Sequence, residues 1–122
     1  MREFKFRAWD KVNRIMYKVF TIDLLTKRVF CGDSYENYDL LKFEDVELMQ
    51  YTGIDIQDKV YEGDIGIDRF ESKVKVVWHS KYACFALEII GIMKNRYNFC
   101  LKDLVKILGN IYENPELLEV KK

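Results

Sequence analysis

The chain has little of several residue types on which particular functions depend. Its 122 residues include one Pro, six Gly, three Cys and one His. The low Pro and Gly content, with 49% apolar and 15% aromatic residues, excludes a collagen-like, low-complexity or disordered chain. One His excludes a metal cluster of several His side chains within one chain, and a Ser-His-Asp or Cys-His centre would have to use His79. We interpret Trp78-His79-Ser80 as the end of a strand and a turn.

Long hydrophobic runs are also missing. No apolar stretch approaches the roughly 20 residues that cross a bilayer as a helix, and residues 1–5 lack the apolar core of a signal peptide. We therefore expect a folded protein of the cytoplasm with no membrane partner. A chain of this length fits one compact domain, or two small parts that share a core.

The three cysteines are odd in number, lie in apolar surroundings and include no Cys-x-x-Cys pair. This pattern favours free, buried thiols over a disulfide or a zinc site. Neither a metal nor another cofactor is expected. The residues concerned are Cys31, Cys84 and Cys100.

An excess of either charge is absent as well, but the zero net charge conceals segregation along the chain. Residues 1–30 carry a net charge of +5, residues 31–68 of −9, residues 69–108 of +5 and residues 109–122 of −1. Acidic and basic segments that are neighbours in the fold would neutralise one another locally. Alternatively, a bipolar surface would favour self-association or a charged partner.

What the chain does contain is alternation typical of strands. Phe4, Phe6 and Ala8 alternate with charged residues, which predicts a half-buried strand. The next two apolar stretches are rich in Val, Ile, Thr and aromatic residues. An antiparallel meander with little helix is therefore predicted, with strands over residues 4–8, 15–25 and 28–31.

The meander is predicted to form a first part, residues 1–53. Residues 34–45 are polar and rich in Tyr, and we predict a loop or a short helix there. A last strand begins at Glu47 and ends at Thr52-Gly53, because Gly readily adopts a positive φ.

A second part, residues 54–122, is predicted to be an SH3-like β-barrel. Gly63 is placed at a bend that leads into a strand, with Ile65 and Ile67 facing the core. Strands that recur about every 8–12 residues are typical of a barrel or a sandwich. Further strands are expected over residues 73–78 and 84–90. One helical turn at Leu101–Leu104 is then expected to lead into a last strand over residues 105–112.

The clearest local signal is Asn114-Pro115-Glu116. Asn is a strong N-cap, Pro suits the first helical position and Glu is favoured there by the helix dipole. A short C-terminal helix is therefore predicted to begin at Pro115, with Leu117 and Leu118 as its anchors. The fold class expected for the whole chain is β-rich α+β.

Four segments of the sequence form a distinctive set that spans the chain. They are Lys5-Phe6-Arg7-Ala8-Trp9-Asp10, Leu48-Met49-Gln50-Tyr51-Thr52-Gly53, Tyr61-Glu62-Gly63-Asp64-Ile65 and Gly109-Asn110-Ile111-Tyr112-Glu113-Asn114-Pro115-Glu116-Leu117-Leu118. In residues, order and spacing, these segments resemble the YopX-like family of phage and prophage proteins. The resemblance implies a β-rich architecture in two parts with an SH3-like barrel for the later part, a phage or prophage origin and self-association. It lends no catalytic residues.

The best candidates for chemistry are carboxylates that could hold a divalent ion as part of a metal-dependent enzyme. Acidic residues on the turns of a β domain are more often solvated, and Asp64 is expected to bond the backbone of its own turn. The carboxylates are Asp55, Asp58, Glu62, Asp64 and Asp68.

Nucleic-acid binding is the other alternative, because basic residues are interleaved with aromatic residues in the later part. A sequence pI near 6.6 argues against it, as does the alternation of Lys73 and Lys75 with an apolar strand face. The candidate basic patch comprises Lys73, Lys75, Lys81, Lys94 and Arg96.

The sequence thus favours a non-enzymatic accessory protein that binds copies of itself or an unknown host or phage protein. Tyr is enriched at protein interfaces, although the Tyr side chains within the four segments that resemble the YopX-like family equally suit internal packing. The candidate contact residues are Tyr51, Tyr61, Trp78, Tyr82, Tyr97 and Tyr112.

Overall fold

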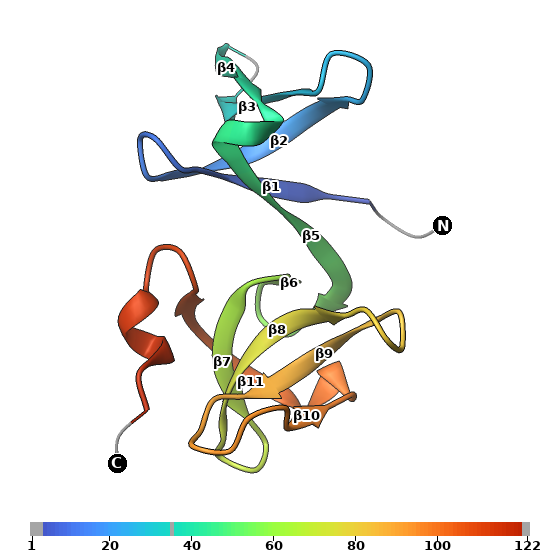
Figure 1. Cartoon of the computed structure of the whole chain (residues 1–122), viewed down its shortest axis with the longest axis vertical. Helices are drawn as coiled ribbons and strands as arrows, with labels where there is room; N and C mark the ends of the chain where they lie inside the picture. The colour runs from blue at the N-terminus through green and yellow to red at the C-terminus, as the bar shows by residue number, and fades with distance from the viewer. Residues whose placement is uncertain (1–3, 35, 121–122) are drawn as a thin grey trace. The chain divides into compact units, whose positions relative to one another are not determined.

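The computed structural model describes residues 4–34 and 36–120. It divides into two compact units, Met1–Tyr51 and Thr52–Lys122. Both are built from antiparallel strands, and the helical residues are confined to short 3₁₀ turns (Figure 1). The predicted β-rich architecture with very little helix is confirmed.

In the first unit the first four strands form a meander, and β5 returns to pair with β1. These strands belong to a six-stranded sheet of order β4-β3-β2-β1-β5-β6, whose last strand is β6 (Lys59–Tyr61), and the pairings among β1 to β5 are antiparallel. The strands are β1 (Phe6–Asp10), β2 (Ile15–Asp23), β3 (Arg28–Ser34), β4 (Asn37–Lys42) and β5 (Val46–Asp55), the last of which continues into the second unit.

Successive side chains of a strand point to opposite faces of the sheet, and this alternation determines which of them form the core. Ala8, Val29 and Cys31 are fully buried, and Val46 is 5% exposed. Half-buried apolar side chains pack against these four residues: Tyr17, Val19, Leu41, Phe43 and Leu48.

Two predictions for the first unit are wrong. Residues 37–42 form strand β4, not a loop or a helix, and a 3₁₀ turn follows at Phe43–Asp45. Pairing with β3 over six registered positions overrides the weak strand propensity of β4, since Gly32 lets the two backbones approach closely. The strand β5 does not end at Gly53 but continues to Asp55. Gly53 does have the predicted positive φ, +90°.

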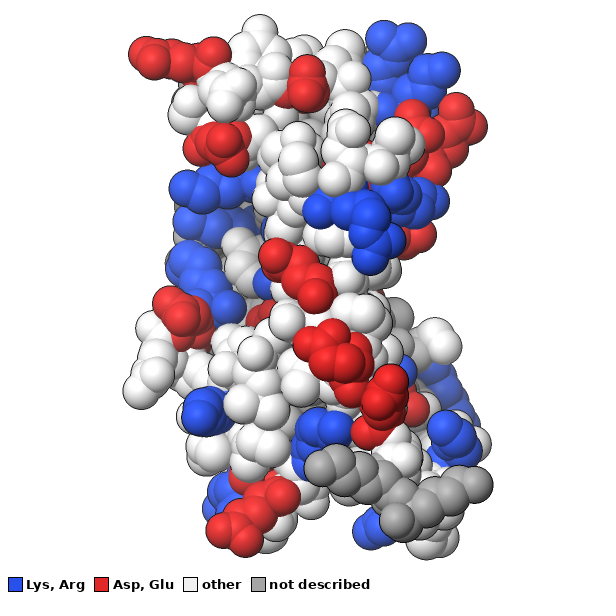
Figure 2. Space-filling model, turned by 90° about the vertical axis from the view of Figure 1, so that its left-hand side faces the viewer, with Lys and Arg blue, Asp and Glu red and all other residues white. Residues whose placement is uncertain are grey.

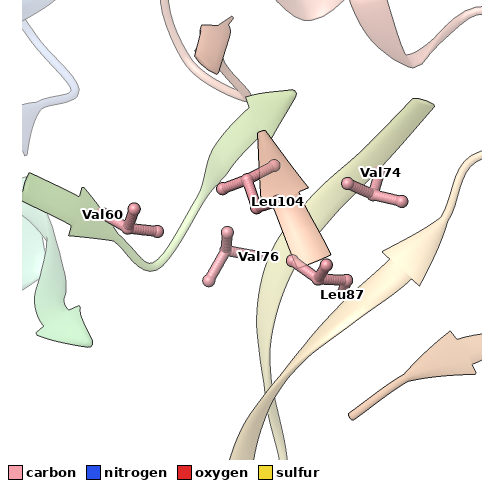
Figure 3. Packing of buried hydrophobic residues seen from close by; sticks show 5 residues of the cluster. All are labelled: Val60, Val74, Val76, Leu87 and Leu104. Carbon is pink, nitrogen blue, oxygen red and sulfur yellow. The ribbon is translucent and has the colours of Figure 1, made fainter. Parts of the chain in front are cut away.

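The second unit contains a five-stranded antiparallel sheet of order β10-β9-β8-β7-β11. Its core is formed by side chains from four strands. The core residues are Val60, Val74, Val76, Leu87 and Leu104 (Figure 3). The strands of the unit are β6 (Lys59–Tyr61), β7 (Asp64–Asp68), β8 (Lys73–His79), β9 (Cys84–Ile89), β10 (Tyr97–Asn98) and β11 (Leu104–Asn110), with a 3₁₀ turn at Leu101–Asp103.

The predicted SH3-like barrel is not confirmed, because the five-stranded sheet is open. Barrel closure requires hydrogen bonds between the two outer strands. Within the described ranges, 4–34 and 36–120, β10 and β11 do not pair. The outer strand β10 has only two residues, which is too short to supply a closing ladder.

The predicted C-terminal helix is wrong. Pro115–Leu118 forms a single 3₁₀ turn, and Glu119 returns to extended backbone. The side chain of Asn114 makes no N-cap hydrogen bond. Its Oδ1 instead accepts the backbone N–H of Asn110 at 3.2 Å, so Asn114 holds the end of β11 and not the start of a helix.

Candidate interaction surface

Four aromatic rings meet where β8 and β9 are joined and where β10 runs alongside. His79 stacks on Tyr82 with ring centroids 5.0 Å apart and meets Tyr97 edge-on at 4.7 Å. Phe99 contacts His79 at 5.3 Å and Tyr82 at 5.4 Å, both nearly edge-on. We call these four residues the aromatic surface. Tyr82 is 60% exposed and Phe99 48% exposed, so the cluster is accessible to a partner.

Strand register explains how these residues come together. His79 is opposite Cys84 at the end of the β8–β9 ladder, and the turn between them places Tyr82 over the His79 ring. Ala83 has the left-handed φ of 50° that the turn requires. The backbone N–H of Tyr82 donates to His79 Nδ1 at 3.4 Å, which joins this turn to the end of β8.

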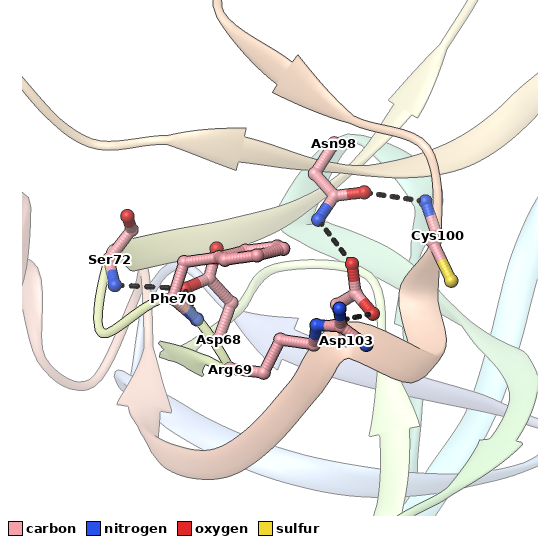
Figure 4. A network of polar contacts seen from close by, with 7 residues as sticks. All are labelled: Asp68, Arg69, Phe70, Ser72, Asn98, Cys100 and Asp103. Atoms are coloured by element: carbon pink, nitrogen blue, oxygen red, sulfur yellow. Dashed lines mark hydrogen bonds and ion pairs between the residues drawn. The ribbon is translucent and has the colours of Figure 1, made fainter.

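A polar network fixes the segment that carries Phe99 (Figure 4). Asn98 Nδ2 donates to Asp103 Oδ2 at 2.8 Å, and Asn98 Oδ1 accepts the N–H of Cys100 at 2.9 Å. Both bonds connect Asn98, which precedes Phe99, to residues that follow Phe99. Since Asn98 is opposite the buried Leu87, its side chain takes the inner face, whereas Tyr97 and Phe99 join the outer aromatic rings.

The same network reaches the turn between β7 and β8. Arg69 donates its backbone N–H to the Asp103 carbonyl at 2.8 Å, and its side chain lies 3.8 Å from the Asp103 carboxylate. The buried Asp68 carboxylate accepts the N–H groups of Phe70 and Ser72 at 2.9 and 2.8 Å. The turn between β7 and β8 therefore supports, through Asp103, the segment that carries Phe99.

The predicted contact residues do not all gather here. Tyr82 and Tyr97 belong to the aromatic surface, whereas Tyr51 is buried at 6% exposure, and Tyr61 and Tyr112 are half-buried. Trp78 is 48% exposed and forms an edge-on pair with Phe85 at 5.0 Å. Successive side chains of a strand point to opposite faces, so Trp78 lies on the face of Val76 and not with His79.

His79 and Phe99 were not among the predicted contact residues. The signal for His79 was its place at the end of the strand beginning at Lys73. Phe99 had no such signal, because its position depends on the two-residue strand β10 and on the Asn98–Asp103 bond.

The predicted basic patch is divided. Lys75 pairs with Glu88 at 3.5 Å, and Lys73 Nζ donates to the Glu119 carbonyl at 3.2 Å. Lys94 shares a hollow of about 180 Å³ with Lys75, Glu88, Leu118 and Val120, and Arg96 is exposed nearby on the β9–β10 loop. Lys81 belongs to the opposite end of β8, with its Nζ 5.4 Å from the Tyr82 ring centroid.

Acidic and basic side chains are interspersed over the face drawn in Figure 2, with no broad patch of one sign. Lys11 of the first basic block pairs with Glu47 of the acidic block at 3.5 Å. These observations favour local neutralisation over a bipolar surface on this face.

Three of the five predicted carboxylates have polar partners close by in the chain. Asp64 Oδ2 accepts the N–H of Tyr61 at 2.8 Å, which confirms the expected bond to its own turn. Asp55 pairs with Lys59 at 4.0 Å, and Asp68 holds the β7–β8 turn. In the part of the chain that the structure describes, no three His, Cys, Asp or Glu side chains are grouped so that they could hold a metal.

The three cysteines are free thiols, as predicted, but they differ in burial. Cys31 is buried, Cys84 is half-buried and Cys100 is exposed, so the prediction that all three are buried is wrong for Cys100. Burial, with the neighbouring Asp10 and Asp39 carboxylates, raises the pKa of the Cys31 thiol to about 11. Cys31 therefore stays protonated at neutral pH and is a poor nucleophile.

The sequence pattern of the YopX protein family matches residues 5–119. The chain belongs to this family. Three solved chains match this YopX protein, among them the crystal structure of protein EF1440 from Enterococcus faecalis. That structure is 24% identical and has a TM-score of 0.64, with 98% of this chain and 100% of that chain covered. The likeness shows a shared fold. No curated protein shows significant similarity to the chain.

The helices of the YopX protein are short 3₁₀ turns. Over the described residues, none is long and apolar enough to cross a membrane.

Proposed function

We propose that this YopX protein is a non-enzymatic accessory protein of phage or prophage origin, which acts in the host cytoplasm by binding a protein partner through the aromatic surface. The observation that carries the proposal is the exposure of Tyr82 and Phe99 on a rigid support. Tyr and Phe bury large areas at little cost in side-chain entropy, which is why aromatic residues dominate binding energy at interfaces.

The support makes the surface suitable for binding. Asn98, Asp103 and Arg69 fix the backbone on both sides of Phe99, so few conformations are lost when a partner docks. Lys81 adds one cation beside the Tyr82 ring. A partner with apolar groups and a nearby carboxylate complements this arrangement.

The alternative, a nucleic-acid-binding module, finds less support in the geometry. Binding to a phosphate backbone depends on a continuous basic track. Here Lys73 and Lys75 are engaged by a carbonyl and a carboxylate, and Lys81 is separated from both by the length of β8. The metal-dependent alternative is weakened because Asp64 and Asp68 satisfy the N–H groups of turns.

An affinity capture from phage-infected or prophage-carrying host cells tests the proposal. The variant Tyr82→Ser/Phe99→Ser should lose a protein that the natural chain retains. Phe70→Ser is the matched control, because Phe70 is 61% exposed but lies in the turn at the other end of β8. A captured protein that both variants bind equally would contradict the assignment of the surface. Salt-sensitive binding of labelled single-stranded DNA, lost in Tyr82→Ser/Phe99→Ser, would favour the alternative.

A further inference from the structure

The loop between β9 and β10 exposes two neighbouring apolar side chains at its tip. Ile92 is 74% exposed and Met93 is 67% exposed. Residues 91–95, which include both, form bends and not strand. Single apolar side chains on a surface are common, but two adjacent large ones leave apolar area in water that burial against a partner would remove. The loop is thus a protrusion with an apolar tip.

The base of this loop is fixed to its sheet. The N–H of Ile89 donates to the Arg96 carbonyl at 2.8 Å, and the N–H of Ile90 donates to the Lys73 carbonyl at 2.8 Å. Asn95 has a left-handed φ of 60°, which turns the chain back toward β10. The apolar tip is therefore presented to solvent from a closed base.

The turn between β7 and β8 leaves the same end of the sheet (Figure 1), because Lys73, which follows this turn, is bonded to Ile90 at the base of the loop. This turn adds a third apolar side chain. Phe70 is 61% exposed, and the guanidinium carbon of Arg69 lies 4.9 Å from its ring centroid. Phe70 thus accompanies the apolar tip of the β9–β10 loop at one end of the second unit.

Basic residues follow the apolar tip. Residues 89–102 include Lys94, Arg96 and Lys102 but no Asp or Glu. Lys94 and Arg96 come just after Met93 and are exposed. The loop therefore has a positive charge of its own.

Carboxylates near this end belong to other segments. Asp103 lies 3.8 Å from Arg69, and Glu88 lies 3.5 Å from Lys75, so each has a basic partner. The β9–β10 loop is thus the basic segment of this end. The remaining carboxylates here are Asp68, which is buried, and Glu71 and Glu119, which are exposed.

An apolar tip followed by cations matches the surface of an anionic bilayer. Apolar side chains are buried at the boundary of the acyl chains, while Lys and Arg meet phosphates and anionic head groups. A narrow protrusion suits a fluid bilayer, which adapts to its shape, whereas a protein interface of ordinary size buries about 800 Å² on each partner. The expectation of no membrane partner rested on the lack of a spanning segment, which a surface contact does not require.

We propose that the β9–β10 loop docks the protein on the surface of an anionic bilayer, with Ile92 and Met93 at the boundary of the acyl chains and Lys94 and Arg96 among the head groups. The cytoplasmic leaflet carries anionic lipids, so a protein in the host cytoplasm has access to such a surface. The aromatic surface gathers around His79 at the other end of β8. The two contacts are therefore separate, and neither proposal depends on the other.

Co-sedimentation with lipid vesicles tests the docking. The natural chain should bind phosphatidylcholine vesicles with about 30% phosphatidylglycerol at least about tenfold more tightly than vesicles of phosphatidylcholine alone. Raising NaCl from about 0.05 M to about 0.5 M should weaken this binding. Ile92→Ser/Met93→Ser should reduce it by at least about tenfold, because no apolar side chain then enters the bilayer. Lys94→Glu/Arg96→Glu should reduce it by at least about tenfold at low salt, because anionic head groups then meet like charges.

Two control variants lie in the first unit. Leu24→Ser/Leu25→Ser removes two neighbouring apolar side chains that are 76% and 96% exposed. Lys18→Glu/Arg28→Glu changes the net charge by the same amount as Lys94→Glu/Arg96→Glu. Both controls should bind anionic vesicles much more tightly than the two loop variants. Tyr82→Ser/Phe99→Ser should bind them like the natural chain, which separates this proposal from the aromatic surface.

Met93→Trp tests insertion of the tip directly. Brominated acyl chains should quench its added Trp, whereas Trp9, which is 6% exposed, and Trp78 of the natural chain should be quenched less. A natural chain that stays in the supernatant with anionic vesicles would overturn the proposal, as would equal binding by Ile92→Ser/Met93→Ser. Loss of a captured host protein in that variant, without vesicle binding by the natural chain, would instead assign the loop to a protein contact.

Discussion

Three aspartates show how single residues of this chain terminate strands. Asp10 and Asp23 each end a strand, and the fourth residue after each, Arg14 and Lys27, has a left-handed φ of 58° and 55°. In each turn the carboxylate accepts N–H groups of residues two and three positions later. Asp68 accepts N–H groups two and four positions later. The Asp side chain thus supplies acceptors that the sheet no longer provides.

Asp10 is the most buried of these carboxylates, at 1% exposure. Burial raises its pKa, but the hydrogen bonds from the Asn13 backbone and side chain and from the Val12 backbone outweigh burial, so its pKa lies below the ordinary 3.8. A folded-state pKa below the unfolded value stabilises the fold above the unfolded pKa, and this stabilisation is lost as the pH falls through the folded pKa.

We therefore expect Asp10→Asn to lower the free energy of unfolding by about 1–3 kcal/mol at neutral pH, since buried N–H groups lose a charged acceptor. The difference from the natural chain should shrink as the pH falls from about 5 to about 2. Urea unfolding followed through Trp fluorescence measures this. The control Asp58→Asn, at an exposed bend, should show almost no difference. A deficit in Asp10→Asn that stays constant over this pH range would contradict the role of the charge.

Among the elements, the pairing of β7 with β11 depends on a close backbone approach. The register between these strands shifts twice, and a Cβ at Gly66 would collide with the Lys106 carbonyl and with Leu104 Cδ1. Leu104 is a core residue, and backbone cannot move aside as a flexible side chain can. The position therefore requires Gly for space, not for an unusual φ.

Gly66→Ala should lower the free energy of unfolding by about 1–3 kcal/mol, because the added methyl group forces the two strands apart. In Gly91→Ala, nothing lies within 4 Å of the new Cβ, so the same substitution should change stability by less than about 0.5 kcal/mol. Chemical denaturation of both variants measures the contrast. Equal effects at the two glycines would mean that the β7–β11 contact does not limit stability.

Strands with strong alternation or many β-branched residues could be predicted from the sequence. Residues 15–25 and 73–78 carry such patterns and correspond to β2 and β8. β4 could not be predicted in this way, because Asn37–Lys42 contains no β-branched residue and its pairing with β3 makes it a strand. The C-terminal helix was predicted from Asn114-Pro115, but the same Asn side chain bonds Asn110 in the folded chain. A local signal failed there because a tertiary contact used the capping group.

The candidate site could be predicted only in part, because its assembly also depends on contacts between segments that are distant in the sequence. Tyr82 and Tyr97 could be selected as aromatic residues next to turns, and the structure leaves Tyr82 exposed and Tyr97 half-buried. Their meeting with His79 and Phe99 depends on strand register and on the β10 backbone, since Tyr97 is opposite Glu88 and Phe99 is the first residue after β10. Sequence periodicity specifies the face of a residue within one strand, whereas a cluster from three segments requires the pairing of those strands.

At the scale of the whole molecule, each unit has its own core. The first unit packs around Val29 and Cys31, and the second packs around Val76 and Leu87. These two clusters share no residue, although the strand β5 runs from one unit into the other. The chain therefore has two centres of stability connected by continuous backbone, and the two units need not open together.

Leu87→Ala tests this independence, because Leu87 is fully buried in the second unit. Loss of its side chain should cost about 2–5 kcal/mol where the cavity forms. Native-state hydrogen exchange should then be faster in β7, β8 and β9, while the amides of β2 and β3 keep their protection. The isosteric control Leu87→Met should change exchange much less, since it keeps the volume. Uniform acceleration across β2, β3 and the second unit would mean that β5 couples the two cores into one cooperative structure.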